Sequence, residues 1–557
     1  MKLSEITYKR FDLEGAKQKY AEITDKFDKA EDIQTQLNAY NEFIGIFKNY
    51  STCESLSYIR FTLNTEDELY SKETDFYDET SPIVTKMYTE FAKHMLNSKF
   101  RKELEAALSP LIFTNYEIAR KAFDERILED VQEENRLTTE YKKLLSSAQI
   151  PFRGEVLNIS QIGKYKESVD RETRREAFNA HGAFMKENSE KFDNIFDKLV
   201  KVRDRMAKKM GYKNYVELGY YRMGRNCYSP KDIEAFREQV IKDWVPFVNK
   251  MKKAQAAELG IDKIMLYDDT ICLKNGNPEP VGTVDEIFNN GKCMYEEMSK
   301  ETGEFINFML EHELFDVIAR KGKSVGGYCT ELADYKMPFI FANFNGTYGD
   351  VDVLTHEAGH ALASYKAMKN IPLYELNQGG METCEVHSMS MEFFAWKWMD
   401  LFFKEKASNY RFMHISNAIY FIPYGTMVDY FQQCVYEKPE MNPSDRKALW
   451  LKLESIFRPY MGQEGITYME EGGRWQYQSH IYERPFYYID YCLAQTIAMN
   501  FLIAMNNDYD NAFKKYDAFI SKGGSQTYVE LVKEAGFNLP FEKGALSQLI
   551  KSLQVFF

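Results

Sequence analysis

The sequence predicts a mainly α-helical protein with one small β-sheet near its middle. Apolar residues recur at helical spacing through most of the 557 residues. Aromatic and β-favouring residues bounded by glycine are concentrated in one stretch, residues 325–344. Glycine (30) and proline (15) are sparse for this length, which argues against long flexible linkers. We therefore expect a compact chain.

The first half of the chain is predicted to be almost entirely helical. Residues 1 to about 150 combine helix-period patterns with dense charge, as in EFAKHMLNSKFRKELEAALSPLIF. A short alternating piece after Pro151 and Gly154 is interpreted as a hinge or hairpin between helical layers. From Asp170 to about Leu310 the helical patterns resume, interrupted by glycines and by the turn-forming residues 275–278.

The middle of the chain differs in composition and contains strand-forming and turn-forming residues. Residues 325–330 and 337–344 are predicted to form two short strands. The turn-forming residues 345–350 then lead directly into a helix. After a loop with Pro372 and the pair Gly379 and Gly380, a second helix is predicted over residues 381–392. This loop allows the second helix to lie antiparallel to the first.

Charge and cysteine content limit the possible partners. Acidic residues outnumber basic ones, 84 to 71, so the net charge of -13 favours neither nucleic acid nor anionic lipid. The N-terminus MKLSEITYKRF has no apolar run typical of a signal peptide, and we find no stretch of the roughly 20 apolar residues of a membrane span. The eight cysteines show no C-x-x-C pair and are predicted to be free thiols. We expect a cytoplasmic protein without nucleic-acid or membrane partners.

The first helix of the middle region contains the motif His356-Glu357-x-x-His360. Residues four apart share one face of a helix, so both imidazoles can point at one ion, and neutral imidazole suits zinc. Glu357 can then lie beside the water that the metal activates and accept its proton. With eight histidines in the chain, accidental matches are expected on the order of once in a hundred such sequences.

A catalytic zinc ion needs a third protein ligand and leaves its fourth position to water. The second helix offers four candidates, Glu382, Glu385, His387 and Glu392. Spacing alone does not choose between them.

Two segments together resemble a known family. The run GDVDVLTHEAGHA, followed by ETCEVHSMSMEFF, is similar to the thimet oligopeptidase and oligoendopeptidase F family of zinc metallopeptidases, most closely its short bacterial branch. Further similar segments are RDRMAKKMGYKNYVELGYYRMGR, GGYCTELADYKMPFIFANFNGTYGD and GGRWQYQSHIYERPFYYIDYCLA. The resemblance covers the chain from about residue 110 to the C-terminus.

The resemblance implies the missing parts of a catalyst. It makes Glu385 the third ligand of one zinc ion per chain, and it implies that His480 and two tyrosines, Tyr488 and Tyr491, face the substrate. A donor of this kind is needed because attack on a peptide carbonyl creates an oxyanion. The interval from His480 to Tyr488 is one residue shorter than in the thimet branch, so the choice between the tyrosines stays open.

Supporting acids are predicted around the ligands. Metal-bound histidine normally donates its second N–H to a carboxylate or carbonyl, and Asp352, Glu382 or Glu392 can accept it. For Asp352, a role as a capping or solvated acid at the start of the helix is equally compatible.

The remaining histidines are not predicted to bind the metal. His387 is expected to line the site, since the short branch resembles the chain here, with a satisfied core histidine as the alternative. Four histidines have no partners in sequence, and no role is predicted for them: His94, His181, His312 and His414.

The strand before the metal helix is predicted to hold the substrate. An extended peptide can add to an exposed strand edge through main-chain hydrogen bonds, which are independent of its sequence. This position predicts substrate contacts for Phe341, Ala342, Asn343 and Gly346.

These predictions combine into one reading. We expect an N-terminal helical region (1–170) and a catalytic region (171–557), and the resemblance implies two helical lobes around a deep channel with zinc at its floor. The expected activity is endopeptidase cleavage of short unstructured peptides. The alternatives are an exopeptidase of the dipeptidyl carboxypeptidase kind on the same fold and a non-catalytic peptide-binding protein. The sequence does not predict the oligomeric state.

Overall fold

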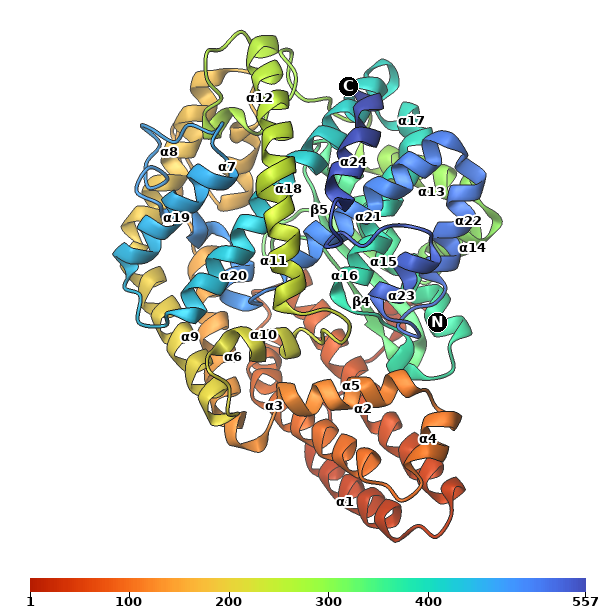
Figure 1. The fold of residues 1–557 in the computed structure, drawn as a ribbon. Helices are drawn as coiled ribbons and strands as arrows, with labels where there is room; N and C mark the ends of the chain where they lie inside the picture. Colours follow the sequence, from red (N-terminus) through yellow and green to blue (C-terminus); the bar gives the residue numbers. More distant parts are fainter.

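The computed structural model describes all residues, 1–557, and contains helices with two small sheets. The predicted mainly α fold is confirmed. The first helices project from one end of the molecule, below the rest in Figure 1. They are α1 (Leu13–Lys29), α2 (Ile33–Leu63), α3 (Glu68–Leu96), α4 (Arg101–Ala107) and α5 (Pro110–Ala122).

The other helices form two lobes, on the left and right of Figure 1. The left lobe contains α6 (Leu128–Ser146), α7 (Ile159–Lys166), α8 (Arg171–Glu187), α9 (Ser189–Lys209), α19 (Pro443–Phe457) and α20 (Ser479–Glu483). The right lobe contains α13 (Val284–Met298), α14 (Lys300–Glu311), α15 (Gly349–Asn370), α16 (Met381–Phe394), α17 (Met399–Phe403), α21 (Tyr488–Asn507), α22 (Tyr509–Ile520), α23 (Tyr528–Glu534) and α24 (Ala545–Leu553). Between them lie α10 (Tyr215–Arg222), α11 (Pro230–Gln239), α12 (Val245–Leu259) and α18 (Ala407–Glu437).

The alternating piece near residue 154 is a hairpin. Strands β1 (Ile150–Phe152) and β2 (Glu155–Leu157) pair antiparallel. Arg153 and Gly154 between them have φ of 49° and 88°, and two positive φ values are what a tight two-residue hairpin turn requires.

The second sheet corrects the predicted substrate edge. The strands are β3 (Phe315–Ile318), β4 (Tyr328–Leu332) and β5 (Met337–Phe344), in the order β3-β5-β4. β5 is therefore the middle strand, with β3 parallel on one side and β4 antiparallel on the other. The sequence analysis missed β3, whose four residues pair with a strand more than twenty residues away. The outer edge next to the metal helix belongs to β4.

Two features of α15 set its position. Asp350 in its first turn accepts hydrogen bonds from the backbone N–H groups of Asn345 (2.8 Å) and Gly346 (2.7 Å), which closes the preceding turn. Gly359 allows α16 to approach closely, because a Cβ there would lie 2.6 Å from Ser388 Cα. The motif glycine is thus a packing requirement of the helix pair.

Buried apolar residues form one large core and several small ones. The large core runs from Leu3 to Leu553 and joins both lobes. The N-terminal helices have their own small cores, between α1, α2, α3 and α5. The predicted division at residue 170 stays a prediction.

Helix α21 has the length and composition of a membrane span, with a mean hydropathy of 1.2 over its apolar window. This differs from the sequence analysis, which found no such stretch. The protein itself buries 72% of that window, as expected for a central core helix.

Candidate metal centre

Two helices bring the three predicted ligands together. His356 and His360 lie one turn apart on α15, and Glu385 lies on α16. Their ligand atoms all lie within 4.8 Å of one another. Glu385 Oε2 is 3.4 Å from His356 Nε2 and 3.6 Å from His360 Nε2.

These distances and atoms fit a zinc ion. In a tetrahedral site with bonds of about 2.0–2.1 Å, ligand atoms lie about 3.3–3.4 Å apart. Burial lowers the pKa of His360 to about 4, which keeps its imidazole in the neutral form that binds metal. Burial also disfavours the charged form of His356, but Glu385 and Glu392 outweigh it and raise the pKa of that histidine. The two carboxylates thus favour positive charge at His356, and the same charges would favour a metal cation there.

His356 is held from behind by a chain of hydrogen bonds. Its Nδ1 lies 2.6 Å from Glu392 Oε1, and Glu392 Oε2 lies 2.7 Å from His414 Nε2. Trp396 Nε1–H donates to His414 Nδ1 at 2.9 Å. Because His414 Nδ1 is an acceptor, its Nε2 carries the proton that Glu392 accepts. His414, for which no role was predicted, lies on α18, and sequence reasoning had no local signal for it.

Of the three predicted supporting acids, only Glu392 reaches an imidazole. Asp352 instead accepts a hydrogen bond from Tyr410 OH, and burial raises the pKa of its carboxyl to about 6. The predicted capping alternative for Asp352 is also wrong, since Asp350 makes the bonds to the turn. Glu382 accepts a 3.4 Å hydrogen bond from Tyr228, away from both imidazoles.

Glu357 lies beside the metal group without a partner of its own. Its side chain is 7% exposed, and burial, partly opposed by His356, raises the pKa of its carboxyl to about 7. A pKa near neutrality suits a group that must take up and release a proton. A Cβ built at Gly327 would lie 3.5 Å from Glu357 Oε1, so the stretch before β4 passes next to this carboxylate.

An aromatic cluster lies against the same group. Tyr487, at the start of α21, donates its hydroxyl proton to Glu385 Oε1 at 2.5 Å. Tyr491, one turn later, has its hydroxyl 3.5 Å from His480 Nε2. Burial raises the pKa of Tyr491, and the charges of Glu385 and Glu357 add to this effect. Its ring packs against that of Tyr487, with ring centroids 4.9 Å apart.

The two tyrosines that the sequence left open, Tyr488 and Tyr491, make different contacts. Tyr488 packs against Phe421 and Tyr424, with ring centroids 5.6 Å and 6.0 Å away, and has no hydrogen bond to the metal group. Tyr487 was not among the predicted site residues. Its spacing of four from Tyr491, which puts both on one helical face, was the signal that could have identified it.

Burial contradicts the predicted substrate contacts of Phe341 and Ala342 on β5, whereas those of Asn343 and Gly346 stay predictions. Phe341 and Ala342 are fully buried. Asn343 donates to the backbone oxygens of Ser324 (2.8 Å) and Gly326 (2.9 Å), so it holds the loop before β4. Gly346 is exposed in the turn before α15.

His387 lies in the core rather than on an open surface. It is 3% exposed, its ring packs edge-on to Phe519 at 5.9 Å, and burial lowers its pKa to about 3. By contrast, the side chains of His356 and His360 are 22% and 19% exposed. The metal position can therefore be reached from solvent.

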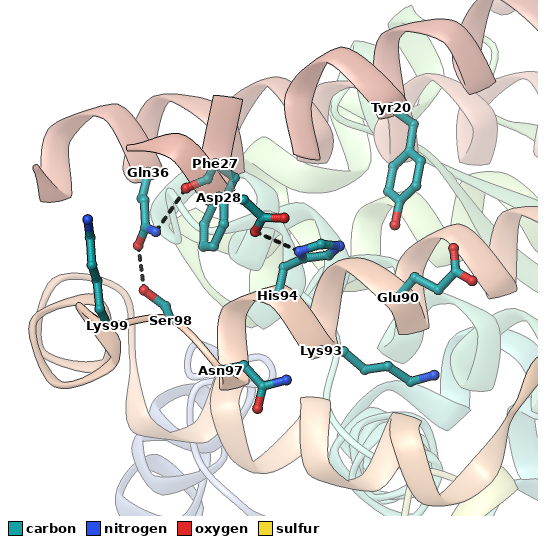
Figure 2. A pocket seen from close by; sticks show the side chains of 10 residues that line it. All are labelled: Tyr20, Phe27, Asp28, Gln36, Glu90, Lys93, His94, Asn97, Ser98 and Lys99. Carbon is teal, nitrogen blue, oxygen red and sulfur yellow. Dashed lines mark hydrogen bonds and ion pairs between the residues drawn. The ribbon is translucent and has the colours of Figure 1, made fainter. Parts of the chain in front are cut away.

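A separate depression of about 630 Å³ lies on the N-terminal helices and contains none of the predicted site residues. Some of its side chains bind one another, as Figure 2 shows. Asp28 pairs with His94 at 2.8 Å, Gln36 donates to the backbone of Phe27, and Ser98 donates to Gln36. It holds no group of metal ligands.

Known proteins resemble the chain along its whole length. The Peptidase M3 N-terminal domain matches residues 3–123, and Peptidase family M3 matches residues 164–277 and 295–550. Oligopeptidase PepF of Bacillus subtilis (strain 168) is 23% identical over 435 residues, 73% of this chain and 63% of PepF. The match therefore spans less than two thirds of that relative.

Solved structures are more similar in sequence. The structure of PZ peptidase A with an inhibitor is 44% identical, with a TM-score of 0.97 and coverage of 100% of this chain and 99% of that chain. A structure described as an oligoendopeptidase F is 43% identical, with a TM-score of 0.97 and coverage of 100% and 98%.

Proposed function

This chain belongs to peptidase family M3, and from that premise we propose that it is a zinc-dependent endopeptidase of short, unstructured peptides. Membership confirms the predicted resemblance, and the match to residues 3–123 extends it toward the N-terminus from the predicted start at about residue 110. The observation that carries the proposal is the convergence of His356, His360 and Glu385 within 4.8 Å, with Glu357 beside them.

The chain's own residues define the site. His356, His360 and Glu385 would hold one zinc ion, which when bound supplies a Lewis acid that polarises the scissile carbonyl and makes water more acidic. Glu392 fixes the ring of His356, and Tyr487 fixes the carboxylate of Glu385. Ligands held in this way need little reorganisation during the reaction.

Glu357 is the proposed general base. Its buried carboxylate takes a proton from the attacking water and then passes it to the leaving amine. The pKa of about 7 supports both steps near neutral pH. The hydroxyl of Tyr491, with His480 behind it at 3.5 Å, is the proposed donor to the oxyanion, because its ring packs against Tyr487, which binds Glu385.

The outer edge of β4 is the proposed place for the peptide backbone. β4 is the end strand of its sheet, residues 325–327 before it are exposed, and Gly327 borders Glu357. A peptide added there would make main-chain hydrogen bonds to β4 that hold its backbone beside Glu357. This binding would depend little on the side chains of the peptide. A deep channel and a cytoplasmic location remain part of this proposal.

The test is metal analysis combined with peptide cleavage. We expect about one zinc per chain, and loss of cleavage with a chelator that zinc restores. A fluorogenic peptide blocked at both ends separates endopeptidase from exopeptidase activity, since only the former cleaves it. Glu357→Gln should lose several orders of magnitude in kcat with zinc retained. Full activity of this variant would rule out the proposed role of Glu357, and absence of zinc would rule out the metal centre.

A further inference from the structure

The segment RDRMAKKMGYKNYVELGYYRMGR is shared with the family but contains no metal ligand. It forms the end of α9, then α10, and the loop that follows. Several of its side chains contact one other part of the chain, residues 481–490, which connects α20 of the left lobe to α21 of the right lobe. That connecting segment lies between His480 and Tyr491.

Arg203 of α9 holds the first end of the connecting segment. This arginine is fully buried. Its guanidinium donates to the backbone oxygen of Tyr482 and, at 3.4 Å, to that of Ile481. Glu134 accepts from its Nε at 2.6 Å and compensates the buried charge.

Arg225, in the loop after α10, holds the other end. Its Nη2 donates to the backbone oxygen of Phe486 and to Asp490 Oδ1 at 2.8 Å. Both side chains are 1% exposed, and Tyr228 also donates to Asp490 at 2.8 Å. One guanidinium thus joins the residue before Tyr487 to the first turn of α21.

Phe486 is strained and tightly enclosed. Its φ is 68°, a left-handed conformation that is unfavourable for a non-glycine residue and that only surrounding contacts maintain. Its N–H donates to Gln432 Oε1 at 3.1 Å. A Cβ at Gly219 of α10 would lie 2.7 Å from the Phe486 ring, so this glycine makes room for it.

We propose that Arg203 and Arg225 are positioning residues that fix the two ends of the connecting segment and thereby place Tyr487 and His480 against the metal group. Neither arginine contacts a metal ligand. The effect passes through Phe486 to Tyr487, whose hydroxyl bonds to Glu385 at 2.5 Å. Loss of the Arg225 contacts should therefore weaken the hydrogen bond from Tyr487 that holds the carboxylate of Glu385. This inference rests on the proposed zinc function.

A double-mutant cycle of zinc affinity tests the inference. Tyr487→Phe removes the bond to Glu385 and should weaken zinc binding about tenfold, measured by competition with a chelator. Arg225→Lys, whose side chain ends one bond short of the Nη2 atom that makes both contacts, should weaken zinc binding by a similar factor. The double variant should lose no more than the larger single loss, because both changes act on one contact. The kcat of Arg225→Lys should fall tenfold or more, with KM changed less than twofold.

Arg174 provides the matched control. It is also buried (4% exposed), pairs with Asp268 at 2.8 Å and donates to the backbone of Tyr267 at 2.9 Å, but it contacts nothing between residues 480 and 491. Arg174→Lys should lower thermal stability comparably while zinc affinity and kcat stay at wild-type values. Equal losses of zinc affinity in both lysine variants would overturn the inference.

The remaining outcomes are also decisive. If Arg225→Lys does not fold, the isosteric Asp490→Asn loosens the same guanidinium more gently and must show the same non-additivity with Tyr487→Phe. Additive losses, with normal zinc binding and cleavage by the wild type, would overturn the positioning role alone. A wild-type protein that binds no zinc and cleaves no peptide would overturn the proposed function and this inference together.

Discussion

The carboxylate of Glu392 binds two imidazoles at once, His356 at 2.6 Å and His414 at 2.7 Å. Glu392→Gln keeps the shape of the side chain but removes its charge and one acceptor oxygen. We expect zinc affinity to fall about 10- to 100-fold in chelator competition, because such partners orient the ligand and raise its basicity.

Glu382→Gln is the control for this prediction. Glu382 is a buried carboxylate on the same helix, but it accepts a hydrogen bond from Tyr228 and none from an imidazole. The zinc affinity of the Glu382→Gln variant should equal that of the wild type. Equal affinity in both glutamine variants would show that the bond from Glu392 to His356 contributes nothing to binding.

Two neighbouring tyrosines differ in their expected importance. Tyr491 has its hydroxyl 3.5 Å from His480 Nε2, whereas Tyr488 contacts His480 only through its ring, at 5.1 Å. Tyr491→Phe should reduce kcat about 10²- to 10³-fold, the usual loss for one oxyanion donor. Tyr488→Phe should stay within a few-fold of the wild type. Steady-state kinetics on one peptide compares them, and a larger loss in Tyr488→Phe would reverse the assignment.

At the level of elements, the packing of α15 on α16 brings the ligands together. Gly359→Ala would place a methyl group 2.6 Å from Ser388 Cα, and backbone atoms cannot move aside cheaply. We expect a loss of about 1–3 kcal/mol in the free energy of unfolding, and weaker zinc binding, since Glu385 moves with α16. Chemical denaturation and chelator competition measure the two effects.

Gly45→Ala is the matched control on another helix. Gly45 lies on an exposed part of α2, and a Cβ there meets nothing within 4 Å. This change should stabilise the protein by up to about 1 kcal/mol, because alanine favours the helix. A Gly359→Ala variant that behaved like Gly45→Ala would mean that the two metal helices are not in close contact.

The sequence predicted the elements that carry their own pattern. The motif helix, the second helix and strand β5 follow from local periodicity, and the hairpin was one of two readings of residues 150–157. The order of the sheet did not follow, because β3 and β4 reach β5 through pairings that local sequence does not encode. His414 was missed for the same reason, because it lies on a distant helix and only tertiary packing brings it to the ligands. Tyr487 was missed although its four-residue spacing from the predicted Tyr491 was a local signal.

At the scale of the molecule, one attachment of the N-terminal helices to the rest of the chain is Glu375, in the loop between α15 and α16. Its carboxylate accepts hydrogen bonds from Tyr88 (2.6 Å), Tyr40 (2.8 Å) and Tyr116 (3.0 Å). No cation pairs with it, and burial raises the pKa of Glu375, partly opposed by the three hydroxyls. The loop between the metal helices is thus anchored by uncharged donors.

This anchor makes stability depend on pH. Because the pKa of Glu375 is higher in the folded protein, folding favours its protonated form. That contribution is fully present below the ordinary value of 4.5 and is lost as pH rises through the raised pKa. Glu375→Gln cannot titrate, so the stability of the wild type relative to this variant should decline with rising pH. Denaturant midpoints between about pH 4 and 8 measure it, and parallel curves would contradict it.

The indole of Trp396 ends the chain of bonds that starts at His356, by way of Glu392 and His414. An intrinsic fluorophore is therefore connected to the metal position by hydrogen bonds, in a protein with only five tryptophans. Titrating the apoprotein with zinc should change its emission, and Trp396→Phe should abolish that signal without changing the binding stoichiometry. Tryptophan fluorescence should therefore report zinc binding in the unlabelled protein.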